Sequence, residues 1–160
     1  MTNLMIRTGW ESRINESSGA DPAAKAPFDT DLESLVTYML FADEATLRGP
    51  VVGVSTFTKT FAARGPRDHQ GRSLRDFDLQ KRLFKYPLSY MVYSEAFDAM
   101  PNQVKDRVYR RLYDVLTGRD QSAKFKRLSS DDRRAVLEIL RETKPGLPEY
   151  FMADAVAAVR

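Results

Sequence analysis

The stretch that decides the fold covers residues 64–97 and reads RGPRDHQGRSLRDFDLQKRLFKYPLSYMVYSEAF. It opens with a loop rich in arginine and glycine, continues as a basic segment and ends as an aromatic one. Ser73 follows the loop in the position of a helix N-cap, so we predict a helix over residues 74–85. On a helical wheel the apolar and charged side chains of this segment separate onto two halves, which is typical of an amphipathic helix.

The aromatic segment that follows has helical spacing. Tyr86, Tyr90, Tyr93 and Phe97 stand at i, i+4, i+7 and i+11, and apolar residues fill most of the remaining positions. A helix that is apolar almost all round is a buried one, so we predict a central helix here. A short strand over residues 90–93 is the alternative, and the stripe could also line a ligand pocket instead of the core.

The rest of the chain also predicts helices. Apolar periodicity and capping residues place them at about 4–14, 32–42, 55–63, 102–117, 130–143 and 149–159. Residues 16–27 are small and polar and resemble a linker. The fold class expected is therefore all-α, a single compact domain of about six to seven helices. It divides into an N-terminal segment and linker over residues 1–30, which we expect to be looser, and a helical domain over 31–160.

The composition is that of a soluble globular protein. The 160 residues are 42% apolar and 29% charged and include nine Phe and seven Tyr, which a disordered chain would lack. The absence of cysteine excludes disulfides, thiolate metal sites and cysteine nucleophiles. No apolar run is long enough to span a bilayer, and the first ten residues lack the apolar core of a secretory signal.

Positive charge lies in two blocks. Residues 64–85 hold seven Lys/Arg and three Asp/Glu, and residues 101–127 hold eight and three, while residues 1–63 hold five and eight. Two interpretations follow: a surface for an anionic partner, or basic helices that pack on the acidic N-terminal part.

The loop before residue 74 is a candidate anion site. Its residues Arg64, Arg67, His69, Arg72 and Ser73 combine arginine forks with an expected helix N-terminus, and both favour phosphate or carboxylate. It lacks the P-loop pattern, and no strand precedes it as a dinucleotide site requires. His69 could transfer protons beside Asp68, but no nucleophile accompanies it. The alternative is a structural loop whose arginines bond neighbouring carbonyls and carboxylates.

Two basic helix faces are candidate nucleic-acid contacts. Their residues are Arg75, Lys81, Arg82 and Lys85 in the first block and Arg107, Arg110 and Arg111 in the second. Acidic residues interrupt both faces and no known recognition motif is present, so nucleic acid is the less favoured partner. A single histidine and no cysteine predict no metal site, and nothing predicts a cofactor.

Residues 65–94, 108–118 (VYRRLYDVLTG) and 139–148 (ILRETKPGLP) carry a resemblance. Together they resemble the C-terminal region of a group of bacterial proteins to which no activity is attached, over about residues 40–151. Members of that group are often longer and exported. The resemblance implies a mature or partial chain and a periplasmic location, with the cytoplasm as the alternative, and it transfers no catalytic residue.

The sequence therefore predicts a non-enzymatic accessory or interaction protein whose partner is a protein. Binding of a small anion or nucleotide at the loop of residues 64–73 is the second hypothesis, and nucleic-acid binding is the third.

Overall fold

The structure is a computed structural model and describes residues 1–18 and 22–152. Its helices are α1 (Thr2–Ser17), α2 (Pro22–Met39), α3 (Phe57–Ala63), α4 (Glu95–Asp98), α5 (Asn102–Leu116) and α6 (Ser130–Thr143), with 3-10 helices η1 (Tyr90–Tyr93) and η2 (Ala123–Phe125). The described residues form no strand, only one isolated antiparallel bridge between Phe77 and Phe84. The predicted all-α class is confirmed.

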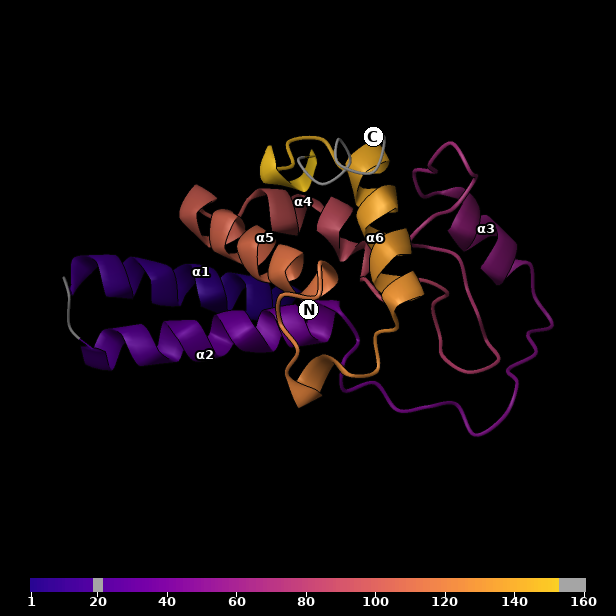
Figure 1. Cartoon of the computed structure of the whole chain (residues 1–160), viewed down its shortest axis with the longest axis horizontal. Helices are drawn as coiled ribbons and strands as arrows, with labels where there is room; N and C mark the ends of the chain where they lie inside the picture. Colours follow the sequence, from indigo (N-terminus) through magenta and orange to yellow (C-terminus); the bar gives the residue numbers. More distant parts are fainter. Residues whose placement is uncertain (19–21, 153–160) are drawn as a thin grey trace.

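The N-terminal segment is helical, and the prediction of a looser segment is wrong. Helices α1 and α2 form an antiparallel hairpin whose closed end projects beyond the body of the protein (Figure 1). Arg7 on α1 donates from Nε and Nη2 to the two carboxylate oxygens of Asp31 on α2, each at 2.5 Å. Thr8 and Ser12 of α1 are buried. Helix α2 runs without a break through residue 30.

The core lies where α2, α5 and α6 meet. Each helix contributes one buried apolar stripe, as its periodicity predicts. The buried residues are Leu32, Leu35, Val36, Met39 and Leu40 from α2, Val104, Val108, Leu112 and Val115 from α5, and Val136, Ile139 and Leu140 from α6. Figure 1 shows α5 lying over the hairpin and α6 running across the end of α5.

The sequence predicts Pro101 in the first turn of α5 and Gly118 at its end. Pro101 lies one position earlier, as the N-cap residue of α5, and Gly118, two residues after Leu116, has φ +76°. The Ser129 hydroxyl accepts a bond from the Asp132 backbone N–H at 3.1 Å and starts α6. The helix predicted over residues 149–159 falls largely in 153–160, which lie outside the described residues.

Residues 74–85 are not a helix, and this prediction is wrong. They form a tight hairpin-like turn in which Asp78 N–H donates to Leu83 O and Lys85 N–H donates to Asp76 O. Packing gives the reason: the Phe77 and Phe84 rings stack with centroids 5.1 Å apart. A helix would hold residues seven apart about 10.5 Å from each other along its axis.

Local hydrogen bonds also support this turn. The Asp78 carboxylate accepts from the N–H groups of Gln80 at 2.8 Å and Lys81 at 3.1 Å, a bonding pattern that competes with helix formation. Leu79 has φ +60°, which no right-handed helix contains. The segment after α2 joins the turn, since Val51 N–H donates to Leu79 O and Leu47 N–H donates to Lys81 O.

The aromatic stripe is not carried by one helix, and the alternative strand is absent as well. The backbone is extended at Ser89 and Ser94, and each hydroxyl accepts an N–H bond from the next helical turn, so η1 and α4 begin separately. Phe97 and Tyr86 are buried, while Tyr90 and Tyr93 are half-buried. The aromatic segment therefore does reach the core, but as two short turns.

Of the described helices, none is both long and apolar enough to cross a membrane.

Candidate interaction surface

The loop of residues 64–73 is built around a buried carboxylate. The Asp68 side chain is fully buried and accepts from the N–H groups of Gln70 at 3.0 Å and Arg72 at 2.8 Å, and from Arg72 Nε at 2.6 Å. Burial alone would raise the pKa of Asp68, but the bonds from Arg72 outweigh it and hold that pKa below its ordinary value. Arg72 Nη2 also lies 2.8 Å from Glu138 Oε2, which attaches the loop to α6.

The other predicted anion-binding residues also contact the protein itself. Arg67 pairs with Asp76 at 2.9 Å and bonds two backbone carbonyls. His69 donates its backbone N–H to Glu142 at 2.7 Å, and its ring Nδ1 lies 2.5 Å from the same carboxylate. The bond from the His69 backbone is the main reason that the pKa of Glu142 is lowered.

Ser73 is buried and caps no helix. Its N–H donates to Asp76, and its hydroxyl accepts from Arg75 N–H. A Cβ at Gly65 would lie 2.5 Å from Ser73 Oγ, so glycine is required there. Arg64 is exposed; its backbone N–H donates to Phe61 O at 3.3 Å, and its side chain makes no hydrogen bond or ion pair with another described residue. These contacts favour the structural interpretation of the loop.

The first predicted basic face does not form, because its residues do not share a helix. Arg82 pairs with Asp132 of α6 at 2.5 Å. The Arg75 guanidinium lies over the rings of Phe61 and Tyr90, at 4.8 and 4.6 Å from their centroids. Lys81 and Lys85 remain exposed.

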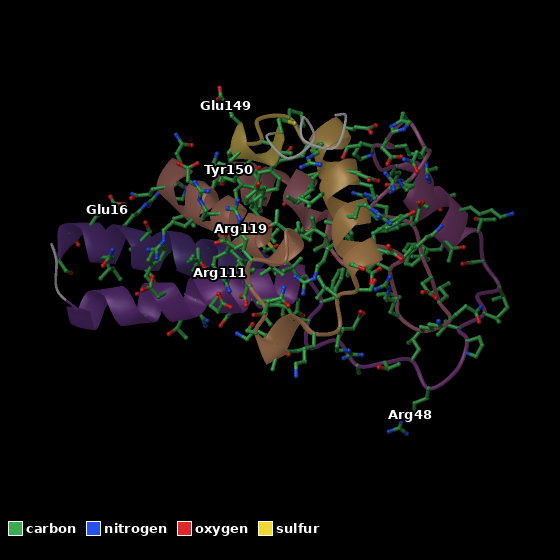
Figure 2. All side chains as sticks on the ribbon, viewed as in Figure 1. Glu16, Arg48, Arg111, Arg119, Glu149 and Tyr150 are labelled. Atoms are coloured by element: carbon green, nitrogen blue, oxygen red, sulfur yellow. The ribbon has the colours of Figure 1, made fainter. Side chains whose placement is uncertain are left out.

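The second basic face is directed largely toward the N-terminal hairpin. Arg107 pairs with Asp29 at 2.6 Å, and Arg111 (Figure 2) pairs with Glu33 at 2.9 Å. The bond from Arg111 is the main cause of the lowered pKa of Glu33. Arg110 lies 4.0 Å from the centroid of the Tyr150 ring. The structure therefore agrees with the second interpretation of the charge blocks, in which basic side chains pack on the acidic N-terminal part.

The lowered pKa values of these carboxylates indicate that the folded chain loses stability in acid. Hydrogen bonds and cations lower the pKa values of Asp68, Asp132, Asp120 and Glu33 in the folded chain. A lowered folded-state pKa contributes stability above the unfolded-state pKa that is lost as the pH falls through the folded value. We expect the free energy of unfolding from urea titrations to fall between about pH 5 and pH 2. Asp68→Asn is expected to reduce this slope; equal stability at pH 5 and pH 3 would contradict the assignment.

The exposed apolar stripe is on α1. Ile6, Trp10 and Ile14 stand at i, i+4 and i+8, and 57%, 61% and 43% of each residue is exposed. The face of α1 that is turned to the interior carries buried Met5, Thr8 and Ser12. Helix α1 thus buries one large apolar side chain together with two small polar ones, and it leaves three large apolar side chains exposed.

A groove lies beside Ile6 and Trp10 of this stripe. Its volume is about 300 Å³, and its walls come from α1, from α4 and from the segment that joins α4 to α5. The lining residues are Thr2, Met5, Ile6, Gly9, Trp10 and Arg13 on one side and Ala96, Ala99, Met100 and Pro101 on the other. Arg13 is the charged lining residue, and it makes no hydrogen bond or ion pair with another described residue.

A second exposed apolar region lies in the segment before α3. Val51, Val52, Val54 and Phe57 are all exposed, in a loop whose outer edge carries Arg48 (Figure 2). The loop contacts the body through its bonds to the residue 78–83 turn and through Phe57, whose ring lies 5.4 Å from that of Phe61. A groove lies beside the α1 stripe, so that stripe is the better-formed surface.

Comparison of the chain with models of known protein families, with curated proteins and with solved structures gives no match. Among residues 1–18 and 22–152, no three His, Asp or Glu side chains gather as metal ligands would. The α1 groove is thus the site on which a functional proposal rests.

Proposed function

We propose that this chain is a non-enzymatic interaction protein that binds the apolar face of a helix from a protein partner in the α1 groove. The exposed apolar stripe of α1 carries the proposal. Folding leaves three large apolar side chains in water on one helical face, and a contiguous exposed apolar surface typically marks an interaction site.

The groove also indicates the chemistry of its partner. A helix side chain inserted between Trp10 and Met100 would be covered by both walls, as helix-in-groove recognition requires. Arg13 beside the groove has no carboxylate partner among the described residues, so a partner helix with Asp or Glu next to its apolar face is favoured. Tryptophan and arginine are the residues that most often dominate such interfaces.

The two alternative functions receive less support. Anion binding at residues 64–73 would have to displace carboxylates already bonded to Arg67, Arg72 and His69. Nucleic-acid binding would use arginines whose charges are already paired with Asp132, Asp29 and Glu33.

Trp10 is the only tryptophan, so its fluorescence reports directly on the groove. We expect a designed amphipathic helical peptide with Leu on one face and flanking Glu to shift Trp10 emission to shorter wavelength, saturably. The same peptide with Lys in place of Glu is expected to bind about tenfold more weakly. Arg13→Glu should reverse this preference, and Ile6→Asp should abolish binding of both peptides, because Ile6 is exposed and lines the groove.

Val54→Asp is the matched control, since Val54, like Ile6, is an exposed aliphatic residue but lies outside the groove. It should leave peptide affinity unchanged. Equal affinity for the acidic and basic peptides, or the same loss from Val54→Asp as from Ile6→Asp, would refute the proposal.

A further inference from the structure

A larger cavity lies at the C-terminal end of α2 and has no part in the contacts described so far. Its volume is about 590 Å³. It is lined by Leu4 from α1, Ser34, Thr37 and Tyr38 from α2, Phe41, Asp43 and Glu44 from the turn after α2, Leu83 and Lys124. We propose that this cavity binds a small organic cation, an ammonium or guanidinium group on an apolar body.

Apolar and aromatic groups form its walls. Tyr38 is 59% exposed, and its hydroxyl has no partner among the described residues. Leu4 and Leu83 add aliphatic surface on other sides of the cavity. The size and lining are those of a small-molecule site, and aromatic faces attract cations.

Phe41 forms one wall of the cavity, and the backbone conformation at the end of α2 fixes its position. Phe41 N–H donates to Tyr38 O and Ala42 N–H donates to Thr37 O, which ends α2 in a Schellman motif. The left-handed position of that motif usually holds glycine, yet here it is Phe41, with φ +51°. Its ring stacks on Phe84 with centroids 5.6 Å apart, so this strained residue presents a fixed aromatic surface.

The polar end of the cavity is negative. Glu44 is half-buried, and its carboxylate makes no hydrogen bond or ion pair with another described residue. Exposed Asp43 stands beside it. Burial raises the pKa of Glu44, and this outweighs the attraction of Arg82 and Arg127. A half-buried carboxylate without a partner gains a charge-assisted hydrogen bond when a cation enters the cavity.

The neighbouring cations are engaged elsewhere. Lys124 lies 3.5 Å from Glu33. Arg82 is paired with Asp132, and Arg127 donates to the backbone oxygen of Glu44 and to Thr46 Oγ1 rather than to the Glu44 carboxylate. The cavity therefore has an unpaired negative end and an apolar body, which is the complement of an amphipathic amine and favours it over an organic anion.

Three phenyl compounds of similar size test the inference at pH 7 by NMR titration of the full chain. Phenethylamine carries the ammonium group, phenethyl alcohol is its neutral counterpart, and phenylacetate is its anionic counterpart. We expect saturable binding of phenethylamine with a Kd of about 1 mM, as a ligand of this size allows. The alcohol should bind at least about tenfold more weakly, and the acid should not bind.

Two variants locate the site. Glu44→Gln should weaken phenethylamine binding by about tenfold and leave the alcohol unaffected. Tyr38→Ala should weaken the binding of both phenethylamine and phenethyl alcohol. Glu149→Gln is the control, because Glu149 is exposed and lies outside the cavity.

Equal affinity for amine and alcohol, or an unchanged amine affinity in Glu44→Gln, would overturn the inference. The thermal midpoint of each variant confirms that it is folded. The outcome of this titration does not depend on whether the α1 groove binds a partner, because the groove and this cavity share no lining residue.

Discussion

Replacing Asp68 with alanine is expected to lower the free energy of unfolding by about 3 to 5 kcal/mol, the range seen when one partner of a buried ion pair is removed. The Asp68 carboxylate is fully buried and accepts three bonds within its loop. Its loss would leave two backbone N–H groups and much of the Arg72 charge without a partner away from water. Urea denaturation at pH 7, followed by circular dichroism, measures the change.

Asp131→Ala is the matched control. The Asp131 carboxylate is 81% exposed and pairs with exposed Arg134, so its loss should cost less than about 1 kcal/mol. Comparable destabilisation in the two variants would show that the loop contributes no special stability. A large difference would establish Asp68 as the residue that folds the 64–73 loop and orients Arg72 toward α6.

Phe97→Ala is expected to have a similarly large effect, about 3 to 5 kcal/mol. Phe97 is fully buried, and its ring meets Tyr109 edge-on with centroids 5.5 Å apart. The Lys144 ammonium lies 5.3 Å from the centroid of the same ring. Removing the ring would leave a cavity at α4. The short turns before and after α4 cannot fill that cavity.

Phe57→Ala makes the same chemical change at a residue that is 59% exposed. It should cost less than about 1 kcal/mol, since little of its ring is buried by the rest of the chain. If Phe57→Ala were as damaging as Phe97→Ala, the burial assigned to α4 would be wrong. Denaturant midpoints of both variants, measured side by side, decide the matter.

The helices at α5 and α6 were predictable from the sequence because local signals agree there. Each has a single apolar stripe with helical period, and each has stop or cap residues at its ends, such as Gly118 and Ser129. Propensity, periodicity and capping all indicate one structure, so packing had nothing to override.

The error at residues 74–85 has a definite cause. The period of Leu74, Phe77 and Phe84 fits a helix, and the segment was predicted as one. The same residues also fit a turn in which Phe77 and Phe84 stack, with Phe61 beside Phe77 at 5.3 Å. Packing of these rings against Phe61, which belongs to another element, decided between the helix and the turn. No local sequence pattern contains that information.

The candidate sites divide in the same way. The sequence identified the arginines of residues 64–73 and 101–127, but their partners Glu138, Glu33 and Asp29 lie on other helices. The spacing of Ile6, Trp10 and Ile14 was present in the sequence as well. Its outward direction was not, because burial of Met5, Thr8 and Ser12 set the rotation of α1.

The sequence by itself determined the all-α class, the ends of α5 and α6, and which charged residues were available to pair. Those properties depend on residues a few positions apart, within reach of backbone hydrogen bonds and helical periodicity. Only the tertiary structure decided the turn at residues 74–85, the pairing of the arginines and the exposure of the α1 stripe. Each of these depends on which distant surface a side chain meets, and burial, not local preference, fixes that choice.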